Sequence, residues 1–115
     1  MELQRISFSN GILGEHLKEF FNHKESQLQL QFGTVHLKKG TRIPEEGFTK
    51  HEQKKIVCLL EGKVKLLLEN DPKKHKTIQS GDAFMIDYYE GHGGIILEDV
   101  KLLYVLFGAT SKTIQ

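Results

Sequence analysis

Two histidines in this chain stand in blocks that carry the glycine and acidic residues typical of strand ends and turns. His51 lies in the first block, residues 50–62, and His92 closes the second, residues 81–92. Imidazoles bind transition metals, and near neutral pH they also act as general acids and bases. Strands joined by turns can bring distant residues into one cavity. The two blocks therefore predict a shared chemical site without naming its reaction.

Length and charge place the chain among small globular proteins. Its 115 residues fit one domain, which we expect to span residues 1–115. Sixteen basic and 15 acidic residues leave a net charge of +1, which does not indicate a nucleic-acid partner. No apolar run approaches the ~20 residues that a membrane-spanning helix needs, so no membrane contact is expected.

The N-terminus and the cysteine content bear on the cellular compartment. The first residues lack the basic start and apolar core of a secretory signal. The single cysteine, Cys58, cannot form an internal disulfide, which fits a reducing compartment. We therefore expect a cytoplasmic protein. Because Cys58 stands in an apolar run, we interpret it as a small core residue rather than a catalytic thiol.

Most of the chain after residue 26 has the patterns of short β-strands. Residues 27–32 alternate between glutamine and apolar side chains, which is typical of a half-buried strand. Turns that contain glycine, proline or asparagine separate the later apolar runs, one of them at 70–74. A barrel or sandwich of antiparallel strands is therefore expected over about 27–108, with a loosely held tail from 109 to 115. The further strands are expected at 34–37, 56–60, 64–68, 76–78, 83–88, 95–97 and 102–107.

The N-terminal part carries a helical pattern instead. Asn10 is a residue type suited to capping a helix, and apolar residues follow it at helical spacing. We expect a short amphipathic α-helix of about 11–21, within residues 10–22, which would cover the core or form a dimer contact. Gly11 and Gly14 weaken this helix. The apolar residues of the pattern are Ile12, Leu13, Leu17, Phe20 and Phe21.

The two histidine blocks resemble the motifs of the cupin family. The first cupin motif usually ends in a strand followed by Glu-Gly, as Glu61 and Gly62 do here. The second usually runs from Gly-Asp to a histidine, as residues 81–92 do, although Asp87 and Tyr89 replace a usual proline and glycine. The resemblance covers about residues 33–107. It implies an all-β fold, the antiparallel double-stranded β-helix or RmlC-like jelly-roll barrel, and pairing into a homodimer.

The chain departs from the metal-ligand pattern of the family. The first cupin motif usually reads His-x-His followed four residues later by Glu. Counted back from Gly62, those three positions fall on Thr49, His51 and Lys55. We prefer this alignment because it needs no change of length before Gly62. With His92, only two of the four usual ligands are then present.

A second alignment, shifted by two residues, gives the same two histidines. It makes His51 the first histidine of the motif and moves the remaining positions to Gln53 and Val57. Gln53 could then add a weak oxygen ligand. We keep Gln53 as a candidate pocket residue for this reason.

His51 and His92 are the metal-ligand candidates that the resemblance implies. Two imidazoles can begin a site for zinc, nickel, iron or manganese, but a stable site usually has three or four ligands. In the preferred alignment the ammonium of Lys55 would repel a cation. The sequence implies no cofactor for certain. A divalent transition metal remains the open alternative. Without a metal, the same pocket suits a carboxylate, a phosphate or a sugar acid.

Residues around the two blocks complete the candidate site. Those at 87–90 precede His92 and could contact a ligand or orient the imidazole. Among the other histidines only His36 is retained, since a histidine on a strand can point into a barrel, whereas His16, His23 and His75 stand outside the blocks. The ligand-binding candidates are Thr49, His51, Gln53, Lys55, Tyr89 and His92.

Three functions remain open for such a chain. The first is a small-molecule-binding cupin that holds a small polar or anionic ligand in the barrel, with a degenerate metal site. The second is an isomerase, lyase or dioxygenase that uses His51 and His92 as metal ligands or as acid and base. The third is a barrel that serves only for assembly. Loss of the glutamate ligand favours the first, and the catalytic residues of the second are unknown.

Overall fold

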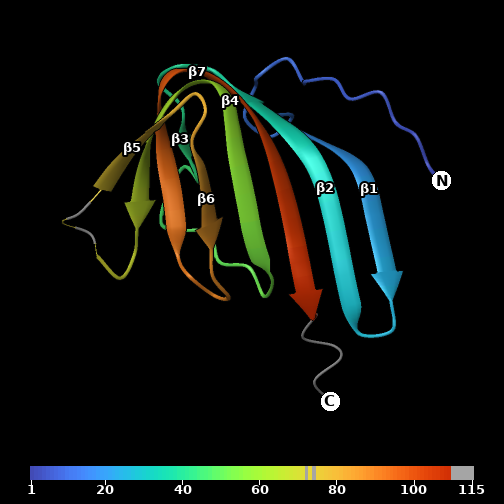
Figure 1. Cartoon of the computed structure of the whole chain (residues 1–115). Coiled ribbons are helices and arrows are strands. Elements are labelled where there is room, and N and C mark those ends of the chain that lie inside the picture. Colours follow the sequence, from blue (N-terminus) through green and yellow to red (C-terminus); the bar gives the residue numbers. More distant parts are fainter. Residues whose placement is uncertain (72, 74, 110–115) are drawn as a thin grey trace.

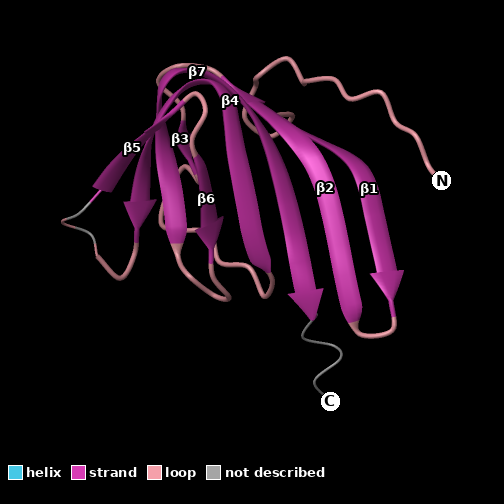
Figure 2. Cartoon of the chain, viewed as in Figure 1, coloured by secondary structure: helices cyan, strands magenta, loops and turns pink. Residues whose placement is uncertain are grey.

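The protein is an all-β structure of seven strands in the computed structural model, which describes residues 1–71, 73 and 75–109 (Figure 1). No helix occurs in this part of the chain (Figure 2), so none is long and apolar enough to cross a membrane. The strands are β1 (Leu17–Glu25), β2 (Leu28–Leu37), β3 (Arg42–Ile43), β4 (Lys54–Leu68), β5 (His75–Gln79), β6 (Ala83–Ile86) and β7 (His92–Ala109).

Two long strands, β4 and β7, pair along their whole length and bend between two sheets (Figure 1). The first half of β4 and the second half of β7 lie in one sheet, flanked by β6 on the β4 side and by β2 and β1 on the β7 side. The other halves form the second sheet, with β5 beside β4 and β3 beside β7. All pairs are antiparallel, which confirms the predicted jelly roll.

The bend in β4 changes which side chains face the interior. Before it, the buried residues have odd numbers, Val57 and Leu59; after it, they have even numbers, Val64 and Leu66. Side chains alternate along a strand with a period of two, so this change requires the bulges that interrupt the pairing near residue 61. Gly62 stands there at φ +94°, and a Cβ at this position would collide with the carbonyl oxygen of Asp99.

The bulge also explains why the sequence pattern suggested two strands. The predicted segments 56–60 and 64–68 are one strand, β4, because the bulge breaks the alternation without ending the ladder. The segments expected at 95–97 and 102–107 are likewise both part of β7. Part of the predicted turn at 70–74, namely Pro72 and Lys74, lies outside the described residues, as does the predicted tail from residue 110 on.

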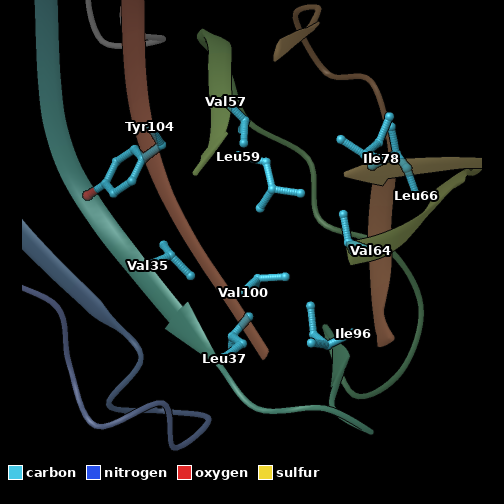
Figure 3. Packing of buried hydrophobic residues seen from close by; sticks show 10 residues of the cluster. All are labelled: Val35, Leu37, Val57, Leu59, Val64, Leu66, Ile78, Ile96, Val100 and Tyr104. Carbon is cyan, nitrogen blue, oxygen red and sulfur yellow. The ribbon is translucent and has the colours of Figure 1, made fainter. Parts of the chain in front are cut away.

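Cross-strand pairs build the inner face of the first sheet. Val57 pairs with Phe84 on β6 and with Tyr104 on β7, and directly opposed residues share a face. The apolar side chains of β2, β4 and β7 project toward one interior, as Figure 3 shows. The buried cluster consists of Val35, Leu37, Val57, Leu59, Val64, Leu66, Ile78, Ile96, Val100 and Tyr104.

The N-terminal helix predicted for residues 10–22 is wrong. Residues 17–25 form β1 instead, which pairs with β2 from Leu17–Val35 to Glu25–Leu28. Before it, Gly11 and Gly14 adopt positive φ angles, which an α-helix cannot contain. The apolar spacing was compatible with a helix, but β1 instead forms a hairpin with β2, which follows it after only the turn at Ser26 and Gln27. A short isolated helix is marginal in water, so this tertiary pairing decides the outcome.

The segment before β1 covers the outer face of β2. There the Thr34 hydroxyl, fully buried, donates to the carbonyl oxygen of Ser7 at 2.7 Å. Nδ1 of His36 lies 2.7 Å from the carbonyl oxygen of Ser9, to which it donates a hydrogen bond. Since Val35 and Leu37 face the interior, the alternation of β2 turns His36 outward. The possibility that His36 points into the barrel is therefore excluded by its position.

Candidate ligand-binding cavity

A cavity of about 480 Å³ lies between the two sheets. This volume falls in the usual range for small-molecule sites. Apolar side chains of β2, β4, β6 and β7 form most of its wall, and no acidic side chain of the described residues lines it. The polar side chains in the wall are those of His16, Thr49, His51, Lys55 and His92.

His92 is held at the start of β7 by backbone and side-chain contacts. Its backbone exchanges two hydrogen bonds with that of Thr49, at 2.8 and 3.0 Å, which ties the loop before β4 to β7. Its Nδ1 lies 2.9 Å from the carbonyl oxygen of Glu90 and donates to it. In the neutral ring the proton is then on Nδ1, so Nε2 carries a free lone pair. Burial lowers the pKa of His92 despite the hydrogen bond to Glu90.

His51 stacks obliquely beside His92. The two ring centroids are 5.4 Å apart with an interplanar angle of 41°. The His51 carbonyl accepts a 2.7 Å hydrogen bond from the backbone amide of Tyr89, which anchors this residue to the loop before β7. Its Nε2 is buried and has no hydrogen-bond partner in the described structure. Burial, and then the charges of Lys55 and His92, lower the pKa of His51 to about 4, so the ring is neutral at pH 7.

Lys55 brings the only basic side chain other than histidine into the wall of this cavity, as far as the chain is described. It pairs with Ile86 of β6 and Leu106 of β7, and so shares their inner face. Its Nζ lies 5.7 Å from the centroid of the Tyr104 ring. Burial lowers the pKa of its ammonium group to about 8. In residues 1–71, 73 and 75–109 no carboxylate lies within ion-pairing distance of it.

His16 is a cavity residue that sequence reasoning set aside. It stands just before β1, where its carbonyl accepts a 3.0 Å hydrogen bond from the backbone amide of His36. The amide of Gly14 donates to His16 Nδ1 at 3.0 Å, so in the neutral ring the proton sits on Nε2. Burial, and then the charge of Lys55, lower its pKa. No local signal marks this residue, because only the pairing of β1 with β2 brings it to the cavity.

Four of the six candidate ligand-binding residues line the cavity, and two do not. Gln53 faces Gln29 of β2, with 3.4 Å between its Nε2 and the Oε1 of Gln29. Tyr89 is 58% exposed in a turn and has a φ of +54°. Its contribution to the cavity is the backbone hydrogen bond to His51 rather than its ring. The residues present in the wall from the predicted set are Thr49, His51, Lys55 and His92.

The residues before His92 act through the backbone. The Glu90 carbonyl fixes the ring of His92, whereas its carboxylate accepts a hydrogen bond from the amide of Asp87 at 3.0 Å. Asp87 lies 3.8 Å from Nζ of Lys54, outside the cavity wall. Cys58 is also outside the wall and partly buried.

The cavity does not fit a tightly bound metal ion. His51 and His92 supply two nitrogen atoms, and no group of three or more histidine, cysteine or acidic side chains suited to a metal occurs in the described chain. Stable sites for zinc and related ions use three or four protein ligands, often with an anionic one. The glutamate position holds Lys55, whose ammonium repels a cation. The imidazole pair is thus better suited to hydrogen bonding than to coordination.

Known proteins share this architecture but not this sequence. No protein-family model matches the chain, and no curated protein matches it. An RmlC-like cupin from Shewanella frigidimarina matches with a TM-score of 0.58 and 17% identity, over 90% of this chain and 94% of that chain. The SPY1581 protein of Streptococcus pyogenes, of unknown function, matches with a TM-score of 0.66 and 15% identity, over 94% and 100%. Fe(II)-HppE, solved with an alternative substrate, matches with a TM-score of 0.56 and 19% identity, over 68% and 42%.

The chain has the cupin fold, an RmlC-like jelly roll, which confirms the resemblance seen in its sequence. At identities of 15% to 19% these similarities show the fold alone. One fold hosts many unrelated activities, so function must be argued from the cavity itself. The match with Fe(II)-HppE, which was solved with an alternative substrate, covers only 42% of the HppE chain.

Proposed function

We propose that this chain is a small-molecule-binding cupin that holds a polar or anionic ligand in the cavity between its sheets. One observation carries the proposal: His51 lines the cavity, and its buried Nε2 has no hydrogen-bond partner in the described structure. Buried polar atoms are nearly always paired, and leaving one unpaired costs about 1–3 kcal/mol. A ligand group that bonds to this nitrogen recovers that cost.

The charge of the cavity defines the head group of the ligand. Lys55 brings a cation without a counter-ion into a wall that holds no acidic side chain among the described residues. The neutral imidazoles of His51 and His92 lie beside each other at the same end of the site. A carboxylate or another anion would pair with Lys55 and accept a hydrogen bond from an N–H donor in the wall, such as Nε2 of His16.

The rest of the wall defines the body of the ligand. Apart from the polar groups, the cavity is lined by aliphatic side chains and Phe84. Apolar ligand surface gains roughly 25 cal/mol for each Å² removed from water. We therefore propose an amphipathic ligand, with an anionic or polar head toward Lys55 and an aliphatic body among the leucine and valine side chains.

A thermal-shift series tests this function. Straight-chain carboxylates such as hexanoate should raise the melting temperature of the protein, and the corresponding alcohols and amines should raise it less. The variant Lys55→Met should lose the preference for the carboxylate, whereas the matched variant Lys54→Met, at an outward-facing residue, should keep it. The absence of stabilisation by any acid of four to eight carbons, tested at millimolar concentration, would contradict the proposal.

The alternative function, a metal-dependent isomerase, lyase or dioxygenase, is less well supported. It would require His51 and His92 to hold zinc, nickel, iron or manganese beside the ammonium of Lys55. Elemental mass spectrometry on the same untagged samples separates the two functions. Stoichiometric metal that disappears in His51→Ala and His92→Ala would favour the enzyme over the binding protein.

Two further properties are carried over from the sequence as proposals. Pairing into a homodimer is supported by the exposed apolar side chains of Leu28 and Leu30 on β2. Light scattering at working concentration would test it. A cytoplasmic location is consistent with the single cysteine.

A further inference from the structure

The apolar surroundings of Lys55 give its amine an uncommon chemical character. The side chain shares an inner face with Ile86 and Leu106, and its Nζ lies over the ring of Tyr104. No carboxylate of the described chain holds it as an ammonium ion. A lysine in such a pocket becomes a nucleophile, because desolvation favours its neutral form.

We propose that Lys55 forms an imine with a 2-oxo carboxylic acid bound in the cavity. This inference rests on the proposed binding function and adds the substrate class. A carbonyl carbon can react with the amine, whereas a simple carboxylate can only pair with it. The carboxylate next to the carbonyl supplies the negative charge that the cavity wall lacks.

The fraction of reactive amine supports this chemistry. With its pKa lowered by burial to about 8, roughly one Lys55 side chain in ten is neutral at pH 7. For an ordinary exposed lysine the fraction is about one in a few thousand. Lys55 should thus react far faster than the other lysines of the chain under the same conditions.

The reaction balances without an added oxidant or reductant. The Nζ lone pair forms a bond to the carbonyl carbon, the carbonyl π electrons move to oxygen, and one proton passes from nitrogen to that oxygen. The resulting hydroxyl leaves with a second proton as water while the nitrogen lone pair forms the C=N bond. The sum is amine plus ketone giving imine plus water. The imine nitrogen then takes up one proton from solvent, and the neighbouring carboxylate of the ligand balances the resulting positive charge.

The histidines are positioned to move these protons. Nε2 of His92 has a free lone pair because Nδ1 donates to the Glu90 carbonyl, so it can accept a proton. Nε2 of His16 carries a proton, because Nδ1 accepts from the Gly14 amide. Both rings line the same cavity as Lys55. The cavity wall thus holds both a proton acceptor and a proton donor beside the amine that it contains.

Borohydride trapping tests the proposal on the intact chain. The protein is equilibrated with 2-oxohexanoate and reduced with sodium borohydride, which converts an imine into a stable secondary amine. The expected product is a protein heavier by the mass of the probe less one oxygen atom, and fragment mapping should place it on Lys55. Excess hexanoate should suppress the labelling by competing for the same cavity.

Matched variants separate the site from general lysine reactivity. Lys55→Arg keeps the charge but should lower the trapped fraction by about tenfold or more, while Lys54→Arg should leave it within about twofold of the original protein. If Lys55→Arg does not fold, the mapping and the hexanoate competition on the unmodified chain still decide the question.

The outcomes distinguish this inference from the function on which it rests. Stabilisation by hexanoate together with no label on Lys55 would overturn the imine and leave the binding function standing. Neither stabilisation nor label would overturn both. Label spread evenly over the surface lysines, without competition by hexanoate, would also overturn the assignment to Lys55.

Discussion

The outer face of β2 and the cavity behind it both bury polar side chains, but the two regions differ in whether these groups have hydrogen-bond partners. On the outer face, Thr34 and His36 each donate to a carbonyl of the N-terminal segment at 2.7 Å. In the cavity, His51 Nε2 has no partner and Lys55 has no counter-ion in the part of the chain that the structure describes. The first arrangement fastens one segment to a sheet. The second leaves polar groups available to a ligand.

The difference has an energetic meaning. A buried hydrogen bond contributes about 1 kcal/mol, whereas an unpaired buried group costs about 1–3 kcal/mol. The outer face therefore stabilises the fold, and the cavity reduces its stability in the absence of a ligand. Unsatisfied groups concentrated in one cavity are typical of functional sites. The comparison predicts opposite consequences for similar substitutions in the two regions.

The largest effect should come from removing the charge in the cavity. Lys55→Met replaces a desolvated ammonium by an apolar side chain of similar length, and we expect the free energy of unfolding to rise by about 2 kcal/mol. Urea unfolding followed by fluorescence or circular dichroism measures the change. Lys54→Met is the control, and it should change stability by less than about 0.5 kcal/mol, because its ion pair with Asp87 is partly exposed. A loss of stability in Lys55→Met would mean that the amine has a stabilising role in the free protein.

The two histidines provide the matched pair for the comparison. His36→Leu removes the hydrogen bond to Ser9 and leaves that carbonyl unpaired, so we expect a loss of about 1–2 kcal/mol. His51→Leu removes an unpartnered nitrogen from the cavity wall, and its stability should be unchanged or higher by up to about 1 kcal/mol. Both variants are measured by urea unfolding without ligand. Equal losses in the two would remove the distinction between the regions.

The smallest effect is the acid sensitivity that the cavity gives to the protein. The pKa of His51 is about 4 in the folded chain and about 6.5 when unfolded, so below pH 6.5 the unfolded state binds the extra proton first. The stability that the neutral His51 ring contributes is thus fully present above pH 6.5, and it decreases as the pH falls toward 4. His16 and His92, whose pKa values are also lowered, contribute with the same sign.

Unfolding at pH 7 and pH 5 measures this dependence. We expect His51 to account for about 1 kcal/mol of the loss at pH 5, after allowance for solvent screening of a partly buried ring. His51→Leu should have a correspondingly flatter profile than the original chain. An unchanged slope in His51→Leu would show that other groups carry the acid sensitivity.

The fold was predictable where local patterns agree with the final structure. Glutamine and apolar residues alternate over 27–32, and β2 begins at Leu28. The Gly62 and Gly81 motifs led to the cupin resemblance, and Gly62 adopts the positive φ that the bend of β4 requires. Turns of this kind depend on the local backbone, so the residue type alone carries the signal. The helix at 10–22 was wrong because β1 pairs in a hairpin with the next strand, β2, and because Gly11 and Gly14 before it adopt positive φ angles.

The cavity was predictable only in part. The alignment with the cupin motifs identified Thr49, His51, Lys55 and His92, all of which line it. It did not separate them from Gln53 and Tyr89, which lie elsewhere, nor did it find His16. The decisive features of the site are an unpaired nitrogen and an amine among apolar side chains. Both are properties of the surroundings, which no residue spacing specifies.

The sequence by itself determined the class of fold and the pair of blocks that meet in it. These features depend on residues that are neighbours in the sequence, so they can be recognised along the chain: the period-two alternation of strands, the glycines at bends and the short turns between strands. Only the tertiary structure decided which histidine faces the interior and what surrounds it. One added residue in a bulge turns every following side chain to the other face, and pKa shifts arise from atoms that are distant in the sequence.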